Sequence, residues 1–367
     1  MESTITENNQ TKMSQWLLEQ TGPLIIAGPC SAESETQVLK TAHQLVKIPQ
    51  VRVFRAGVWK PRTRPNGFEG VGKKGLAWMQ KVKAETGLDT AIEVAKADHV
   101  ELALKYGIDI LWIGARTSAN PFSVQEIATA LHGVDIPVLV KNPIHPDINS
   151  WIGAIERVSQ AGIKKLVAIH RGFSTHENTP YRNAPKWEIP VEFKRLMPEI
   201  PLIADPSHIA GNREMIAQIS QTALDLAMQG LIVECHVNPE SALSDAFQQI
   251  TPEAFSEIIR KLKFRKPEGN GVNGEHTLEI LRSEIDLADT AILEALGRRM
   301  EIAVKIGHYK RDHNMTILQV SRWQTLLEDR LKRANILGLN AEVVKDIFHI
   351  LHNRAIQIQE EVLNKPV

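Results

Sequence analysis

Three side chains of metal-binding type fall where apolar runs of the sequence end. Cys30 follows LIIAGP, His208 follows LIADPS, and Glu234 follows LIV. Asp245, in the segment ALSDAF, could complete the set. A thiolate, an imidazole and carboxylates together suit a divalent transition metal such as manganese, iron, cobalt or zinc. A lone buried cysteine is more often a small core residue, so only the joint placement of these donors argues for a site.

Positively charged side chains fall at or just after the ends of other apolar runs. They are Arg55, Lys60, Arg116, Lys141 and Arg171. One arginine at such a place is usually part of a surface ion pair, but five cations directed at one site would repel one another without anions between them. Guanidinium groups bind phosphate and carboxylate in the same forked geometry. The set therefore predicts an anionic substrate that carries phosphate and carboxylate groups.

Eight short apolar runs, alternating with helical stretches between residues 24 and 265, would position these side chains. The runs are LIIAGPC, VRVFRAG, DTAIEVA, ILWIGAR, PVLVKN, LVAIHRG, LIADPSH and LIVECH. Strands this apolar are typical of a parallel sheet buried on both faces. Eight strand–helix repeats favour an α/β fold of the (β/α)8 TIM barrel type, with a doubly wound open sheet as the alternative.

In such a barrel the active site lies at the C-terminal ends of the strands. The first and eighth strands of a closed barrel are neighbours, so Cys30, His208 and Glu234 can converge there. Cys235 follows Glu234 directly and should point to the opposite side of its strand, into the core.

The rest of the chain has a different pattern. The segment KPEGNGVNGEH, residues 266–276, contains three glycines and a proline and is expected to be a linker. Apolar residues then recur with a helical period, which predicts a small all-α domain over 277–367. Its first helix is expected to begin at an N-cap, Thr277, with further helices over about 316–334 and 341–361. Residues 1–23 are expected to be an N-terminal extension before a barrel domain over 24–265.

Composition excludes several classes of protein. Lysine and arginine total 43, as do aspartate and glutamate, so the formal net charge is zero. This balance argues against bulk binding to nucleic acid or to an anionic membrane surface. No apolar stretch approaches 18 residues, and the polar N-terminus does not read as a signal peptide. Two cysteines form no disulfide framework, which favours a cytoplasmic location.

The motifs at the predicted strand ends resemble those of one enzyme family. GPCSAES, FRAG-x-WKPRT, IGART, DPSH and ALSD closely resemble 3-deoxy-D-arabino-heptulosonate 7-phosphate synthases over about residues 20–265. The compact subtype without an added regulatory domain is most similar. The most specific motif is KPRT, at 60–63. The sister octulosonate-phosphate synthases carry a KANR-type motif there, so KPRT favours erythrose 4-phosphate over arabinose 5-phosphate as acceptor.

The resemblance implies roles for the residues picked out above. Cys30, His208, Glu234 and Asp245 match the family's metal ligands, with manganese favoured over iron, cobalt and zinc. Lys60, Arg116, Lys141 and Arg171, with Arg55 beside them, match the cations that hold phosphoenolpyruvate, and Lys60 is counted as catalytic. Arg62 and Thr63 match the residues that bind erythrose 4-phosphate. The implied reaction joins the two substrates and releases phosphate.

The group that activates the attacking water stays open. His170, Glu93 and Asp205 are candidates, and core or supporting roles are equally compatible with their positions. A barrel aldolase that forms a Schiff base through Lys141 is a weaker alternative, because it leaves the metal donors unexplained.

The tail, over about 277–362, resembles the all-helical chorismate mutases. The matching residues are Arg282, Arg299, Lys310, Arg322 and Gln359, with Arg299, Lys310 and Gln359 implied as catalytic. Gln319 and Trp323 stand where acidic residues are frequent, and Ala355 replaces a frequent serine. The core cations remain, so conversion of chorismate to prephenate is expected, and these departures could weaken it.

Helix geometry tests whether the tail residues can share a site. Arg299 and Lys310 lie about 16 Å apart along one helix and about 20° from the same face, so both can reach a small dicarboxylate between them. Arg282 lies about 25 Å from Arg299 and cannot reach the same ligand. A second chain could supply it, and the resemblance also implies an intertwined homodimer.

The fusion suggests regulation. Our hypothesis is that prephenate or chorismate, bound at the tail, damps the synthase through a changed contact between the two domains. The competing interpretation is that the tail is a catalytically idle binding or dimerisation module, and chorismate turnover separates the two.

Overall fold

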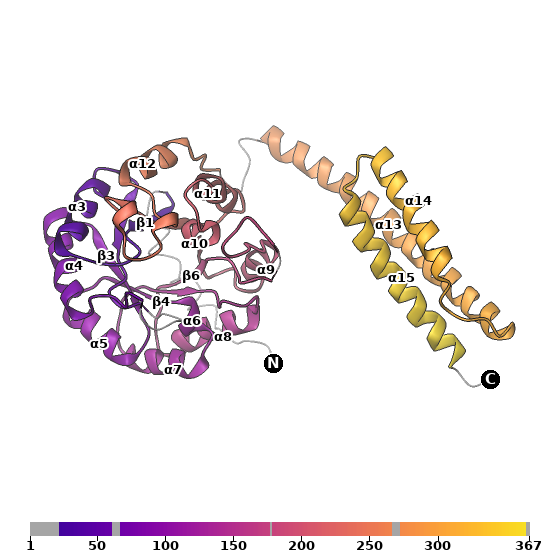
Figure 1. Cartoon of the computed structure of the whole chain (residues 1–367), viewed down its shortest axis with the longest axis horizontal. Helices are drawn as coiled ribbons and strands as arrows, with labels where there is room; N and C mark the ends of the chain where they lie inside the picture. The colour runs from indigo at the N-terminus through magenta and orange to yellow at the C-terminus, as the bar shows by residue number, and fades with distance from the viewer. Residues whose placement is uncertain (1–21, 61–66, 177, 266–271, 365–367) are drawn as a thin grey trace. The chain divides into compact units, whose positions relative to one another are not determined.

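The computed structural model describes residues 22–60, 67–176, 178–265 and 272–364 (Figure 1). The chain divides into two compact units, Met1–Pro267 and Glu268–Val367. The extension predicted over residues 1–23 lies, except for its last two residues, outside the described residues, as do Arg62 and Thr63. No helix in the described part of the chain is both long and apolar enough to cross a membrane.

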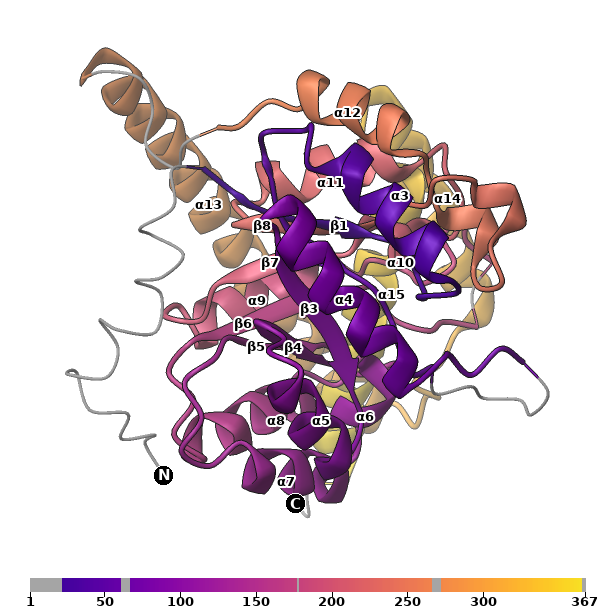
Figure 2. The ribbon, with the colours of Figure 1, turned by 90° about the vertical axis from the view of Figure 1, so that its left-hand side faces the viewer.

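Eight parallel strands close into a barrel in the order of the sequence. They are β1 (Leu24–Gly28), β2 (Val51–Arg55), β3 (Asp89–Val94), β4 (Ile110–Ile113), β5 (Val138–Lys141), β6 (Leu166–His170), β7 (Leu202–Ala204) and β8 (Gly230–Glu234). β1 pairs with β8 along its whole length, with Gly28 opposite Glu234 (Figure 2). The predicted barrel is confirmed, and the open sheet is excluded.

Helices follow the strands and cover the outside of the barrel (Figure 1). The longer ones are α3 (Glu35–Leu45), α4 (Lys73–Thr86), α5 (Ala97–Lys105), α7 (Pro121–Ala130), α8 (Ile148–Gln160), α9 (Glu188–Leu196), α11 (Ile216–Asp225) and α12 (Pro252–Lys261). The shorter ones are α6 (Ala115–Ser118), α10 (Pro206–Ala210), η1 (Pro239–Ser241) and η2 (Ala246–Gln248). Ser34, Asn120, Asp147 and Thr251 cap the starts of α3, α7, α8 and α12 by accepting backbone N–H groups.

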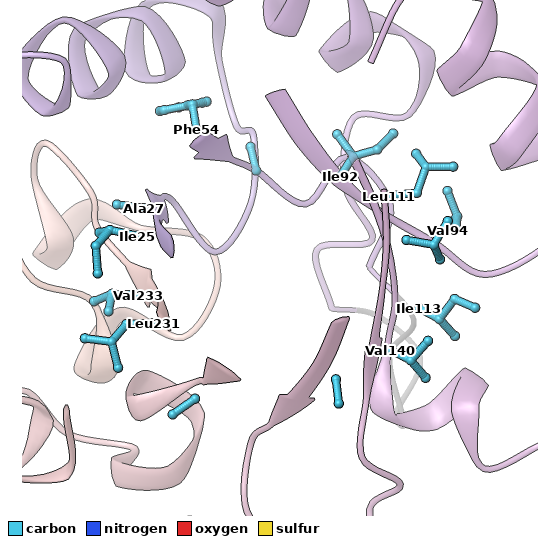
Figure 3. Packing of buried hydrophobic residues seen from close by; sticks show 14 of the residues in the cluster. Ile25, Ala27, Phe54, Ile92, Val94, Leu111, Ile113, Val140, Leu231 and Val233 are labelled. Atoms are coloured by element: carbon cyan, nitrogen blue, oxygen red, sulfur yellow. The ribbon is translucent and has the colours of Figure 1, made fainter. Parts of the chain in front are cut away.

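The alternation of side chains along each strand builds two apolar layers. One layer lies between the strands and the helices and includes Ile25, Phe54 and Ile92 (Figure 3). The other fills the barrel and includes Ile26, Val53 and Trp112. Burying one such large side chain contributes about 1.5–3 kcal/mol. Successive residues of a strand face opposite sides of the sheet. Every second residue, counted from one that faces the barrel interior, therefore also points inward, up to the residue at the C-terminal end of the strand.

The second unit is all-helical, as predicted. It contains α13 (Val272–Asp312), α14 (Val320–Ile336) and α15 (Ala341–Leu363), with Ala303, Ala355 and Ile358 buried where the helices pack. α13 begins inside the predicted linker, so Thr277 is not its N-cap; residues 266–271 of that linker lie outside the described residues. A glycine costs a helix only about 1 kcal/mol, and Gly274 therefore does not stop a helix that the following residues propagate.

Candidate active sites

The C-terminal mouth of the barrel gathers the predicted metal donors. Sγ of Cys30 and one carboxylate oxygen each of Glu234 and Asp245 all lie within 4.8 Å of one another. Cys30 Sγ lies 3.2 Å from Asp245 Oδ2. The pairing of β1 with β8 brings these residues together, although more than 200 positions separate Cys30 from the other two.

His208 completes the group from the side of β7. Asp205 caps α10 and accepts the backbone N–H of His208, which fixes the start of that short helix. The imidazole Nδ1 lies 2.8 Å from Asp205 Oδ2, and Nε2 lies 3.8 Å from Glu234 Oε1. Nε2 therefore faces Glu234, while Asp205 holds the other ring nitrogen and orients the ring.

The donor set fits a divalent transition metal. Glu234 Oε1 is buried and has no hydrogen-bond partner among the residues that the structure describes. Arg55 Nη2 pairs with this oxygen at 3.4 Å, and a metal ion bound there would add the short, direct contact that the oxygen lacks. Cys30, Glu234 and Asp245 lie close together, and His208 Nε2 lies 3.8 Å from Glu234 Oε1. The three donor types of a mixed transition-metal site, thiolate, imidazole and carboxylate, are therefore present.

The electrostatics of the donors agree with this fit. Burial, reinforced by the charge of Glu234, raises the pKa of the Cys30 thiol to about 12. A bound cation would act in the opposite sense, because it stabilises the thiolate. Burial lowers the pKa of His208 and so favours the neutral imidazole that binds metals. Burial works against ionisation of Glu234 and Asp245, but neighbouring cations outweigh it and lower the pKa of both carboxyl groups.

A second feature of the mouth is a cationic cavity of about 80 Å³ beside the donors. Its lining side chains include Lys60, Glu93, Arg116, Lys141, Arg171, Arg182, His208 and Asp245. Lys60 Nζ lies 3.1 Å from Cys30 Sγ and so stands between the cavity and the donors. Arg171 donates to Asn183 Oδ1 at 2.8 Å, and burial lowers the pKa of its guanidinium to about 10. The cavity is therefore built for an anion.

Arg55 lies beneath this cavity rather than in its lining. Its side chain is 1% exposed and stacks over Trp112, with its guanidinium carbon 4.7 Å from the ring centroid. Its Nη2 donates to Cys30 O at 3.1 Å and lies 3.4 Å from Glu234 Oε1. Arg55 therefore contacts two of the predicted metal donors, Cys30 and Glu234. The other four predicted cations, Lys60, Arg116, Lys141 and Arg171, line the cavity.

The three candidates for activating the attacking water, Glu93, Asp205 and His170, have different surroundings in the structure. Glu93 lines the cavity. Asp205 lies 2.6 Å from Lys141 Nζ and is also engaged by His208. His170 follows the outward series of β6, its ring lies against Phe173 and Trp187, and burial lowers its pKa to about 3. His170 is therefore a core residue and is removed from the candidates.

The ion pair of Lys141 also bears on the Schiff-base alternative. An ammonium group held by a carboxylate has no lone pair for attack on a carbonyl carbon, so the pair with Asp205 argues against that reaction. Cys235 lies in the outer apolar layer, as its position after Glu234 predicts.

Sequence reasoning missed Arg182, which lines the cavity and donates to Asp245 Oδ1 at 3.0 Å. It lies in the long segment between β6 and α9, away from any strand end. No periodic pattern marks such a residue. Its only signal is the charge itself, in the segment PYRNAP.

The helical unit has a pocket of its own, of about 340 Å³, between α13, α14 and α15. Four of the five predicted tail residues line it: Arg299, Lys310, Arg322 and Gln359. Lys310 is 8% exposed, and its Nζ donates to Ile317 O. Gln359 Oε1 is buried and has no hydrogen-bond partner in the described part of the chain. Burial lowers the pKa of both Arg299 and Lys310, and the charge of Arg330 adds to the effect on Arg299.

The three residues that depart from the mutase pattern also line this pocket. They are Gln319, Trp323 and Ala355. Trp323 stacks on His352 with ring centroids 3.9 Å apart. Arg282 is not among the lining residues; its side chain is 63% exposed and pairs with Glu279 at 3.5 Å. The separation between Arg282 and the other four residues is thus present in the structure.

Comparisons with known proteins match both units. Residues 14–266 match the family model described as the DAHP synthetase I family, and residues 281–360 match the model described as chorismate mutase type II. The phospho-2-dehydro-3-deoxyheptonate aldolase of Thermotoga maritima is 32% identical over 239 residues, which cover 65% of this chain and 68% of that protein. A 2-dehydro-3-deoxyphosphooctonate aldolase of Geobacter metallireducens is 26% identical and covers 65% of this chain and 91% of its own length.

Solved structures agree with the sequence matches. The crystal structure of the Thermotoga maritima phospho-2-dehydro-3-deoxyheptonate aldolase has a TM-score of 0.58 at 32% identity, covering 65% of this chain and 67% of that one. A truncated form of the 3-deoxy-D-arabino-heptulosonate 7-phosphate synthase of the same organism has a TM-score of 0.56 at 29% identity, covering 65% of this chain and 84% of that one.

Proposed function

Since the chain belongs to the DAHP synthetase I family, we propose that its barrel joins phosphoenolpyruvate to erythrose 4-phosphate and releases phosphate. The product is 3-deoxy-D-arabino-heptulosonate 7-phosphate, the first intermediate of the shikimate pathway. The observation that carries the proposal is the cationic cavity at the barrel mouth, next to the cluster of Cys30, Glu234 and Asp245 with His208 beside it. With the second match, the chain is a bifunctional enzyme with a transferase barrel and an isomerase tail.

The chain's own residues divide the work of the condensation. When bound, a divalent metal, which we propose to be manganese, supplies Lewis-acid polarisation of the acceptor aldehyde, and Cys30, His208, Glu234 and Asp245 would hold it. Arg116, Lys141 and Arg171 bind the phosphate and carboxylate of phosphoenolpyruvate and orient its third carbon toward that aldehyde. The new carbon–carbon bond leaves positive charge on the second carbon.

Water then adds to the second carbon, and the bond from that carbon to the phosphate oxygen breaks. Glu93 lines the cavity, so its carboxylate can accept the proton that the water loses. Lys60 Nζ, which lies between the cavity and Cys30, can donate a proton to the aldehyde oxygen as it becomes a hydroxyl. The neighbouring cations stabilise the departing phosphate.

Gly114 makes room for the Glu93 carboxylate, which gives a first prediction. A Cβ at this position would lie 2.0 Å from Glu93 Oε1, whereas the backbone at Gly114 is compatible with alanine. Since the end of a flexible side chain is what must move, Gly114→Ala should keep the fold and displace Glu93. We expect phosphoenolpyruvate turnover to fall by about tenfold or more, as for loss of a positioned base.

The matched control is Gly153→Ala on α8, where no described atom lies within 4 Å of the added carbon. This variant should keep full turnover and gain about 0.5–1 kcal/mol of stability. Full turnover in Gly114→Ala, measured as steady-state phosphate release, would show that the position of Glu93 does not matter.

The acceptor is the finer point of the proposal and has its own test. Relatives named as octulosonate aldolases match the barrel, so the five-carbon arabinose 5-phosphate is the competing acceptor. The KPRT motif favours erythrose 4-phosphate. We expect the ratio kcat/KM, followed as phosphate release with manganese present, to be at least about a hundredfold higher with erythrose 4-phosphate. A preference for arabinose 5-phosphate would reassign the barrel.

For the tail we propose that it converts chorismate to prephenate. This rearrangement needs no nucleophile or metal; it needs cations that hold two carboxylates in a compact conformer and donors at the ether oxygen. We assign Arg299 and Arg322 to the carboxylates, and Lys310 and Gln359 to the ether oxygen, because all four side chains line the tail pocket.

We propose further that the tail forms a homodimer that supplies Arg282 to the partner's pocket. Leu278, Leu281, Ile285 and Ile292 form an exposed stripe on α13 with the heptad spacing typical of helix pairing. Their exposed fractions are between 44 and 60%, too high for a helix that stays alone in water. Arg282 follows Leu281, so pairing along this stripe would carry it toward a second chain.

Regulation is the last part of the proposal. Prephenate, or chorismate, bound in the tail pocket is proposed to lower the synthase rate of the barrel, because the two units share one chain and the tail's cations form a ready anion site. The test is phosphoenolpyruvate consumption by the full chain as prephenate is added. We place the enzyme in the cytoplasm, where the free thiols of Cys30 and Cys235 stay reduced.

A further inference from the structure

Two consecutive glutamines, Gln248 and Gln249, lie at the end of the 3₁₀ turn η2, and the reaction described above gives them no part. We propose that Gln248 and Gln249 are positioning residues of the metal centre. Gln248 decides which oxygen of Glu234 faces the metal, and Gln249 holds the segment of Cys30 against the segment of Asp245. The inference rests on the metal dependence of the proposed function. Its test distinguishes a failure of the inference from a failure of that metal dependence.

Gln248 is 1% exposed; its side chain holds the Glu234 carboxylate directly and is linked to the Asp245 carboxylate through Arg182. Its Nε2 donates to Glu234 Oε2 at 2.6 Å, which leaves Glu234 Oε1 as the oxygen that faces His208. Its Oε1 accepts a hydrogen bond from Arg182 Nη1, and the same nitrogen donates to Asp245 Oδ1 at 3.0 Å. Each carboxylate therefore has one oxygen occupied and the other directed at the donor group.

Gln249 is fully buried and joins two segments that are distant in the sequence. Its Oε1 accepts the backbone N–H of Cys30 at 2.9 Å, and its Nε2 donates to Ser244 O at 2.8 Å. Asp245 follows Ser244 in the left-handed region, at φ 47° and ψ 41°. That conformation costs a non-glycine residue about 1–2 kcal/mol and persists only when its surroundings hold it.

An amide suits both positions because it is neutral and has a donor and an acceptor at one end. A thioether of similar length fills the same volume but supplies neither. Gln248→Met should let the Glu234 carboxylate rotate, and Gln249→Met should release Cys30 from Ser244. Loss of a group that orients metal ligands typically weakens metal affinity about ten- to a hundredfold.

The test measures metal binding, not turnover. The dissociation constant for Mn²⁺ is measured by calorimetry on the full chain, and the absorption spectrum of the Co²⁺ form reports the geometry around Cys30. The control is Gln229→Met, at the amino-terminal end of β8, where a glutamine Oε1 likewise accepts a backbone N–H, from Leu202 at 2.9 Å. We expect Gln248→Met and Gln249→Met to bind Mn²⁺ about ten- to a hundredfold more weakly, with altered cobalt spectra, and Gln229→Met to match the parent.

Unchanged affinity and spectra in both variants would overturn the inference while leaving the metal site intact. A parent chain that binds no divalent metal would overturn the proposed metal dependence and this inference together. If a methionine variant unfolds, Gln248→Asn keeps the amide but is one carbon too short, and the same weakening is expected. The unfolding temperatures of the metal-free proteins complete the test. If a variant binds metal more weakly but unfolds at the same temperature as Gln229→Met, the result supports positioning. If its unfolding temperature falls far enough to account for the whole loss of affinity, the result contradicts it.

Discussion

A chelator is expected to abolish phosphoenolpyruvate consumption by this protein and to leave chorismate turnover unchanged. The barrel mouth brings together Cys30, Glu234 and Asp245, with His208 beside Glu234, whereas the reaction proposed for the tail depends on cations and needs no metal. Lewis-acid stabilisation is worth several kcal/mol, so Cys30→Ala should lower synthase turnover by about a thousandfold or more. Both rates are followed on the same sample, before and after manganese is added back.

The chain offers a matched control, since it has only one other cysteine. Cys235 follows Glu234 but faces the outer apolar layer, so Cys235→Ala should lose about 1 kcal/mol of stability and keep its synthase rate. Consumption that survives chelation, or that falls equally in the two cysteine variants, would rule out Cys30 as a metal ligand.

The second large effect is expected in the tail. Lys310→Met should lower chorismate turnover by about a hundred- to a thousandfold, the usual cost of removing one donor aimed at developing charge. Lys310 is almost buried in the pocket, and methionine fills a similar volume without the charge. The synthase rate without prephenate should not change. The measurement is the loss of chorismate absorbance under steady-state conditions.

Lys305 supplies the control on the same helix. It is exposed and does not line the pocket, so Lys305→Met should turn over chorismate at the parent rate. A Lys310→Met variant that also keeps the parent rate would favour the interpretation of the tail as an idle binding module.

The sequence predicts the barrel mouth well because strands are periodic. In β2, Val53 faces the barrel interior, so Arg55, two residues later, must point into the barrel mouth. In β8 the same rule takes Ile232, which faces the interior, to Glu234. The same rule shows that His170, which continues the outward series of β6, is a core residue. A donor on a strand can therefore be placed from its register alone.

Residues in irregular segments escape this reasoning. Arg182 and the two glutamines at the end of η2 reach the site from irregular segments, whose paths depend on hydrogen bonds between distant parts of the chain. The predicted start of α13, at Thr277, was wrong for a related reason. A glycine-rich composition indicates a linker only on average, and here the helix extends back to Val272 in spite of its glycine.

In the tail, the spacing of Arg299 and Lys310 predicts a shared pocket, and the structure places both in one. The same arithmetic separates Arg282 from them. In the structure Arg282 is exposed and pairs with Glu279, away from the pocket, and the proposed homodimer would have to bring it to a second chain's pocket.

The most direct test of the account is phosphoenolpyruvate consumption by the full chain with erythrose 4-phosphate and manganese, recorded as prephenate is added. The account predicts consumption that requires both the acceptor and the metal and that falls as prephenate fills the tail pocket. Consumption indifferent to prephenate would contradict the proposed regulation. No consumption with any divalent metal would contradict the assignment of the barrel itself.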